Sequence, residues 1–174
     1  MLQNYNRYRL LKIFLNNPTD SFRLRELSRL SKIAPPSVMN YLKEFEEQEL
    51  IRKYEKRGTP FYRAIRENAN FVFYKKLSIL YELNNSGLID FLWDNLNPDA
   101  IILFGSFAIG EDIESSDIDL FVQCPEKKLN LEKYEKMLGR DINLFYESNF
   151  SRLNKELKNN ILNGIKLKGY LKVF

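Results

Sequence analysis

Two short apolar segments that meet polar residues constrain the fold of this chain most strongly. Residues 100–104 form a continuous apolar run that ends at a Gly-Ser pair, and residues 117–122 place two aspartates before another apolar run. Continuous apolar runs of this length are typical of buried strands. Because residues two apart share a face of a strand, Asp117 and Asp119 point the same way. The sequence therefore predicts two buried strands, one of which presents paired carboxylates.

The Asp117/Asp119 pair is a candidate metal site. Adjacent carboxylates repel each other unless a cation lies between them, and proteins hold Mg²⁺ on a triphosphate in this way. The chain has no histidine and one cysteine, Cys124, which excludes Ser-His-Asp triads, histidine zinc sites and an internal disulfide. Carboxylates favour hard cations, so we expect Mg²⁺ or Mn²⁺. A turn followed by a calcium-type acidic loop is the alternative interpretation.

The Gly-Ser pair at 105–106 is a candidate phosphate site. A glycine lets backbone approach a phosphate closely, and the start of a helix offers unpaired N–H groups. Ser106 adds a hydroxyl donor. We expect a short helix to begin at Gly105 and to end at Gly110.

The string Phe-Gly-Ser-Phe-Ala-Ile-Gly, followed after a gap by Ser-Ser-Asp-Ile-Asp-Leu, resembles the signature of DNA polymerase β-like nucleotidyltransferases. It is similar in kind to the minimal nucleotidyltransferases of bacteria and archaea. The resemblance runs from about residue 101 to 146. It implies a small α/β fold with a mixed sheet, in which Gly105 and Ser106 hold the phosphates of an NTP. Asp117 and Asp119 would bind magnesium, and an acceptor hydroxyl would attack the α-phosphate with loss of pyrophosphate.

Active members of this superfamily carry a third acid on a later strand, which here corresponds to residues 141–146. Asn143 best matches that position; it can offer a carbonyl oxygen at the nucleotide site but cannot act as a base. Asp141 lies on the same face, about 6.6 Å earlier along the strand. It is the remaining candidate catalytic acid if the strand is shifted. An ion pair of Asp141 with Arg140 or a nearby lysine is the alternative.

The distribution of charge separates the chain into two parts. Residues 1–66 contain 14 Lys and Arg against 7 Asp and Glu, whereas residues 67–174 contain 13 against 16. A basic front and a mildly acidic back indicate two modules with different partners. The basic part has the size of a small nucleic-acid-binding domain.

The spacing of apolar residues predicts the helices and strands of the basic part, residues 1–66. We expect helices over 5–16, 23–31 and 35–48, and strands over 50–54 and 61–65. Asp20 or Ser21 can cap the second helix. This order resembles the winged helix-turn-helix regulators of bacteria and archaea over about residues 5–66.

That resemblance implies contacts with double-stranded DNA. The third helix would enter the major groove, and the hairpin would lie over the phosphate backbone. The residues that we expect to face DNA are Ser37, Asn40, Lys43, Lys53, Lys56 and Arg57. A dimerisation or protein-docking domain with a solvated basic face is the alternative.

Aromatic side chains at helical spacing mark the connection between the two parts. We expect helices over 67–84 and 86–95, whose apolar stripes bury either core or the interface of a homodimer. Near the end of the chain we expect a helix from a cap at Ser148 to about Asn163, and then a possible strand.

The sequence therefore predicts an α+β protein with a winged helix-turn-helix at 1–66, a helical connector at 67–96 and a nucleotidyltransferase-like domain at 97–174. Residues 1–5 lack the apolar stretch of a signal peptide, and no run is long enough to span a membrane, so we expect a cytoplasmic protein. The first hypothesis is magnesium-dependent transfer of NMP to a hydroxyl of a small molecule, protein or RNA. The alternatives are a DNA-binding regulator with a nucleotide-sensing or inactive domain, and an antitoxin-like protein.

Overall fold

The computed structural model describes residues 5–174 and contains two compact units, Met1–Ser78 and Ile79–Phe174. The division between them falls inside one helix, α4 (Ala69–Ser86), which lies between the sequence-based boundaries at 66/67 and 96/97. Most of the segment on which the signal-peptide expectation rests, residues 1–4, lies outside the described residues. Each unit is described by itself below.

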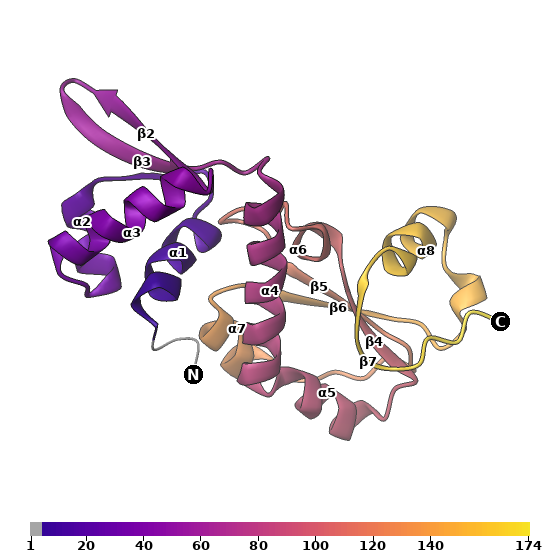
Figure 1. The fold of residues 1–174 in the computed structure, drawn as a ribbon. Coiled ribbons are helices and arrows are strands. Elements are labelled where there is room, and N and C mark those ends of the chain that lie inside the picture. Colours follow the sequence, from indigo (N-terminus) through magenta and orange to yellow (C-terminus); the bar gives the residue numbers. More distant parts are fainter. Residues whose placement is uncertain (1–4) are drawn as a thin grey trace. The chain divides into compact units, whose positions relative to one another are not determined.

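The N-terminal unit contains three helices and a small antiparallel sheet (Figure 1). Its sheet has the strand order β1-β3-β2. The expected order of three helices and a hairpin is present. Its elements are α1 (Asn6–Asn16), β1 (Ser21–Phe22), α2 (Leu24–Ser31), α3 (Pro35–Glu47), β2 (Ile51–Lys56), β3 (Thr59–Ala64) and the first part of α4.

One apolar core holds this unit together. The three helices and the sheet bury one cluster that also includes Phe71 of α4. On α3 the sequence spacing predicts a buried stripe of Val38, Tyr41, Leu42 and Phe45; Val38, Leu42 and Phe45 are buried, and Tyr41 is partly buried against the same core. On α2 helical spacing predicts a buried stripe of Leu24, Leu27 and Leu30. This is wrong for Leu30, which is 50% exposed, whereas Leu27 is fully buried.

The start of α2 differs from the expected cap. The helix begins at Leu24, and the backbone N–H of Arg23 donates to the Glu26 carboxylate. Neither Asp20 nor Ser21 caps it. Ser21 and Phe22 instead form β1, opposite Arg63 and Tyr62 of β3. Burial of Phe22 in the core explains the change, because it draws this segment into the sheet.

A tight turn joins β2 and β3. Arg57 and Gly58 form it, both with positive φ, at 52° and 69°. Two positive values of φ suit the right-handed twist of a hairpin. The two strands reach closer to the turn than the expected 50–54 and 61–65, since β2 ends at Lys56 and β3 begins at Thr59, which places Pro60 in β3 opposite Glu55.

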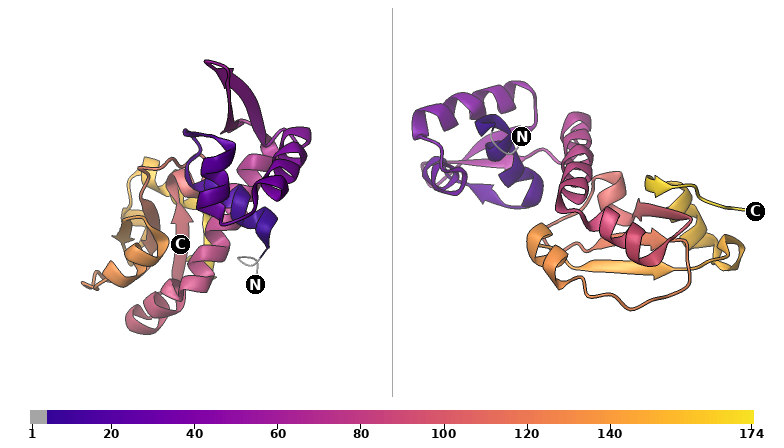
Figure 2. Two further views of the ribbon diagram at one scale, coloured as in Figure 1. Left: turned by 90° about the vertical axis from the view of Figure 1, so that its left-hand side faces the viewer. Right: turned by 90° about the horizontal axis from the view of Figure 1, so that it is seen from below.

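The C-terminal unit is built around a mixed sheet of order β6-β5-β4-β7 (Figure 2). β4 pairs antiparallel with β5 and β7, whereas β5 and β6 are parallel. The α+β class and the mixed sheet expected from the sequence are thus present. The elements are the rest of α4, α5 (Leu88–Leu96), β4 (Ala100–Phe104), α6 (Gly105–Ile109), β5 (Ile118–Val122), α7 (Glu132–Leu138), β6 (Ile142–Tyr146), the 3-10 helix η2 (Phe150–Arg152), α8 (Lys155–Leu162) and β7 (Ile165–Gly169).

Each face of this sheet buries its own apolar cluster. The end of α4, α5 and α7 cover the face that carries Ile118 and Leu120 of β5. α8 and η2 cover the other face, where Phe104, Phe121 and Phe150 pack together. Because β5 alternates between these faces, Asp119 lies on the α8 side of the sheet. That side of the sheet therefore carries the polar side chain of Asp119 beside its apolar cluster.

The last third of the chain departs from expectation in two places. A helix begins at Glu132 where the sequence indicated none. Instead of one helix capped by Ser148, η2 and α8 follow each other, capped by the side chains of Asn149 and Asn154. These asparagines accept backbone N–H groups at 3.0 and 2.8 Å, and each of them thereby starts its own helical segment.

The buried side-chain amide of Gln123 forms hydrogen bonds with the segment that follows β7, at Lys172. Gln123 is 2% exposed, and its side chain donates to the Lys172 carbonyl and accepts from the Lys172 N–H, at 2.7 and 2.9 Å. None of the helices within residues 5–174 is long and apolar enough to cross a membrane.

Candidate functional site

The pairing of three strands brings the candidate residues of the C-terminal unit together. Phe104, the last residue of β4, lies opposite Asp119 of β5, so that Gly105 follows directly beside that carboxylate. On the other side of β5, Asp119 lies opposite Asn143 of β6. Asp119 is therefore the centre of the site.

The Asn143 side chain bridges the two carboxylates. Its amide nitrogen donates to Asp117 Oδ2 at 3.3 Å and to Asp119 Oδ1 at 3.1 Å. Asp117 and Asn143 are exposed and Asp119 is half-buried. The expected common orientation of the two aspartates is thus confirmed, and Asn143 contacts both of them. From the sequence we expect Asn143 to offer its carbonyl oxygen, whereas in the structure its N–H groups face the two carboxylates.

Gly105 is confined by Asp119. Its φ is +70°, and a Cβ built there would lie 2.5 Å from Asp119 Oδ2. Both observations require glycine, because other residues rarely adopt this φ and any side chain would displace the carboxylate. As expected, α6 begins here and ends at Gly110, and the half-buried Ser106 is its second residue.

β6 is not shifted along β5. The carbonyl of Asp141 accepts the N–H of Ile118 at 2.9 Å, and this bond continues the regular parallel pairing. Asn143 consequently lies directly opposite Asp119, and Asp141 lies one residue before β6. The Asp141 carboxylate is exposed and joins the site only through the neighbouring cavity.

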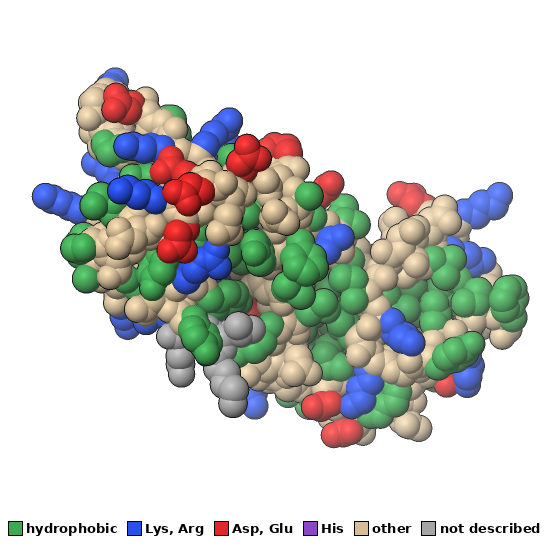
Figure 3. Space-filling view, in the orientation of Figure 1, with side chains coloured by type: hydrophobic (Ala, Val, Ile, Leu, Met, Phe, Trp, Pro, Cys, Tyr) green, Lys and Arg blue, Asp and Glu red, His purple; other side chains and the backbone are tan. Residues whose placement is uncertain are grey.

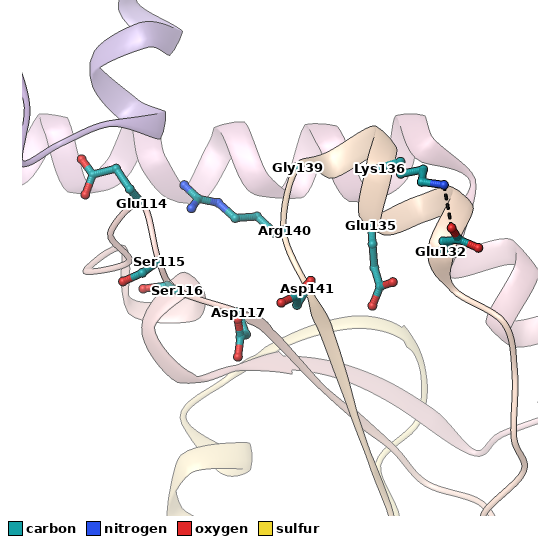
Figure 4. A pocket seen from close by; sticks show the side chains of 10 residues that line it. All are labelled: Glu114, Ser115, Ser116, Asp117, Glu132, Glu135, Lys136, Gly139, Arg140 and Asp141. Atoms are coloured by element: carbon teal, nitrogen blue, oxygen red, sulfur yellow. Dashed lines mark hydrogen bonds and ion pairs between the residues drawn. The ribbon is translucent and has the colours of Figure 1, made fainter.

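A cavity of about 410 Å³ opens beside the carboxylate pair (Figure 4). Asp117 belongs to the carboxylate pair and also lines this cavity. Figure 4 shows Asp117 and Asp141 projecting from adjacent chain segments, and Arg140 extending toward Glu114. The lining residues are Glu114, Ser115, Ser116, Asp117, Glu132, Glu135, Lys136, Gly139, Arg140 and Asp141.

The charges around this cavity are partly paired. Lys136 forms an ion pair with Glu132 at 2.6 Å, and a Glu135 oxygen accepts the N–H of Ile142 at 3.3 Å. Arg140 also packs over the Phe107 ring, 5.9 Å from its centroid. The cavity is thus a polar hollow with an acidic excess, adjoining Asp117.

The donor set of the site suits a hard cation. Within residues 5–174 no group of three or more His, Cys, Asp or Glu side chains forms a metal-binding cluster. Asp117 and Asp119 nevertheless offer two converging carboxylates, whereas the Asn143 amide directs its nitrogen toward them. Oxygen ligands of this kind fit Mg²⁺, which keeps several waters and takes one or two carboxylates together with phosphate.

The residues expected to face DNA lie in the N-terminal unit. All of them are exposed: Ser37, Asn40, Lys43, Lys53, Lys56 and Arg57. On α3 the first three occupy the side opposite the buried Val38 and Leu42. Figure 3 shows Lys and Arg side chains over the hairpin and the neighbouring helices, with acidic side chains among them. DNA contact stays a prediction.

Comparison with protein families places the C-terminal site in a known context. Residues 86–171 match the family described as "Polymerase beta, Nucleotidyltransferase". This range includes every candidate of the C-terminal site. Searches of curated proteins and of solved structures found no match. The family match therefore supports a nucleotidyltransferase domain of the polymerase β family over residues 86–171.

Proposed function

We propose that the C-terminal unit binds an NTP with a divalent cation and transfers its NMP group to an acceptor hydroxyl. The observation that carries this proposal is the convergence of Asp117, Asp119 and Asn143 beside Gly105. A nucleotidyltransferase domain implies an NTP substrate and NMP transfer in general. The two carboxylates support the proposed dependence on Mg²⁺, because this cation prefers oxygen ligands.

Each residue has a distinct part in this proposal. Asp117 and Asp119 would hold Mg²⁺, which when bound would neutralise the negative charge of the phosphates. Gly105 and Ser106 contact the terminal phosphates, since the backbone there is free of a side chain and Ser106 offers a hydroxyl. Asn143 lies at the nucleotide site but cannot accept a proton.

Asp141 is the proposed acceptor of the proton from the attacking hydroxyl. It lines the cavity together with Asp117, and its carboxylate is exposed there. The cavity is correspondingly the proposed place of the acceptor. General-base catalysis needs such a group within hydrogen-bond reach of the hydroxyl in the bound complex.

Titration calorimetry of ATP, GTP, CTP and UTP with Mg²⁺ tests the proposal without knowledge of the acceptor. We expect the wild type to bind at least one NTP, and Asp117→Asn/Asp119→Asn to abolish the binding. The matched control is Asp94→Asn/Glu126→Gln, which removes two exposed carboxylates of the same unit away from the site. Absence of NTP binding by the wild type would refute the proposal.

A DNA-binding regulator whose nucleotidyltransferase domain only senses NTP is the second candidate. The specific observation that favours it is that Asn143, which cannot act as a base, lies opposite Asp119 where the resemblance leads us to expect a third acid. Transfer of label from α-³²P-NTP to any acceptor supports the enzyme, whereas NTP binding that changes duplex affinity without transfer supports the regulator.

The N-terminal unit is, in either case, a proposed winged-helix DNA-binding domain. Exposed polar and basic residues on α3 and the hairpin support this proposal. A homodimer through α4 and α5 is also proposed, since Phe73 and Leu77, one turn apart on α4, are 55% and 46% exposed. Light scattering of wild type and Phe73→Asp/Leu77→Asp tests the dimer, and a monomeric wild type would refute it.

A further inference from the structure

The Asn143 amide occupies the space that a cation would need. Its nitrogen carries two hydrogens, and it makes one hydrogen bond to each carboxylate, with Asp117 at 3.3 Å and with Asp119 at 3.1 Å. The strand pairing fixes Asn143 opposite Asp119. The amide thus supplies the positive end of a dipole where two negative charges meet.

Only one orientation of this amide suits the site without a cation. Turning it by 180° would direct its oxygen at two carboxylates and leave three acceptors facing one another. A bound cation reverses the preference, because it repels the N–H groups and attracts the oxygen. The observed orientation of Asn143 and a cation between the carboxylates are therefore mutually exclusive.

We propose that Asn143 acts as a built-in counter-group: in the site without a cation its N–H groups bind both carboxylates in place of the cation. These N–H groups must turn away when a cation binds. This inference rests on the proposed function of Asp117 and Asp119. It makes Asn143 a positioning residue that lowers the affinity of the site for the free ion. The cation then enters together with the triphosphate, whose charge compensates for the lost hydrogen bonds.

Binding of Mn²⁺ alone, measured by electron paramagnetic resonance, tests the competition. Asn143→Ala removes the N–H groups that compete, so we expect it to bind Mn²⁺ about tenfold more tightly than wild type. Asn143→Asp adds a negative charge as well and should bind more tightly still. The control Asn160→Ala changes an exposed asparagine of α8 and should leave the affinity unchanged.

Two outcomes separate this inference from the proposed function. Mn²⁺ binding by wild type that Asn143→Ala leaves equal or weakens would overturn the counter-group and retain the cation site. Absence of Mn²⁺ binding by wild type and by both Asn143 variants would overturn the cation site, and the counter-group with it.

The side-chain amide gives a direct signature. We expect the Asn143 NH₂ resonances, assigned from their loss in Asn143→Ala, to move when Mg²⁺ is added and Asn160 resonances to stay. Without any cation, Asn143→Asp should melt below wild type, because three carboxylates then converge, and added Mg²⁺ should raise its melting temperature more than that of wild type. Unmoved Asn143 resonances in a protein that binds Mg²⁺ would overturn the inference.

Discussion

Replacement of Gly105 by alanine tests the geometry of the site most directly. The new Cβ would lie 2.5 Å from Asp119 Oδ2, and ordinary contact begins near 3.4 Å, so the carboxylate has to retreat by about 0.9 Å. We expect such a shift of the carboxylate to disrupt its hydrogen bond with Asn143, which the other oxygen, Oδ1, accepts at 3.1 Å. Alanine at a φ of +70° costs a further 1–2 kcal/mol, roughly.

Gly87→Ala is the matched control. Gly87 has a φ of +76° and nothing within 4 Å of its built Cβ, so its replacement carries the backbone cost alone. We expect Gly87→Ala to lower the free energy of unfolding by roughly 1–2 kcal/mol. Gly105→Ala should lower it by about 1–2 kcal/mol more, the cost of one lost hydrogen bond to a charged group at a partly exposed site.

Urea denaturation followed by circular dichroism measures the two free energies, and calorimetry measures binding of NTP with Mg²⁺. Gly105→Ala should lose NTP binding because Asp119 is displaced, whereas Gly87→Ala should keep it. Equal destabilisation by both substitutions, together with unchanged NTP binding by Gly105→Ala, would refute the inferred contact of residue 105 with Asp119.

Three further predictions concern other parts of the chain. Lys56→Glu/Arg57→Glu should weaken binding of double-stranded DNA and flatten its dependence on salt, because contacts with phosphates release counterions. Lys128→Glu/Lys155→Glu is the charge-matched control. Equal affinity of wild type and Lys56→Glu/Arg57→Glu in a gel shift would refute the assignment of the hairpin to the DNA backbone. Burial first, and the charge of Asp99 second, raise the pKa of the Cys124 thiol. Less thiolate is therefore present at a given pH, and alkylation by iodoacetamide should be slow in the native protein and fast in urea; rapid native alkylation would contradict this. Gln123→Ala removes both hydrogen bonds to Lys172 and should lower the free energy of unfolding by about 2 kcal/mol in urea titrations, whereas an unchanged value would show that the C-terminal segment is held otherwise.

The features of the site that depend on local sequence could be predicted. Alternation along one strand sufficed to place Asp117 and Asp119 on one face, with Ile118 and Leu120 buried. The glycines at 105 and 110 sufficed to bound α6. These features need only neighbouring residues, and for that reason they follow from residue type and spacing.

Features that depend on distant residues could not be predicted. The direction of the Asn143 amide follows from its pairing with Asp119, 24 residues away in the sequence. β1 forms because Phe22 is buried against β3, which outweighs the capping preference of Ser21. α7 has only seven residues and one fully buried side chain, Tyr134, so its periodicity gives too weak a signal.

The close approach of residue 105 to Asp119 also links the variation of two positions among related sequences. While a carboxylate occupies position 119, both its space and the positive φ restrict position 105 to glycine. A relative that has replaced the aspartate by a smaller residue is released from the first restriction and keeps only the second, which asparagine tolerates. Departures from glycine at 105 should therefore be found together with loss of the acid at 119, and such paired changes would mark the relatives that have given up the cation.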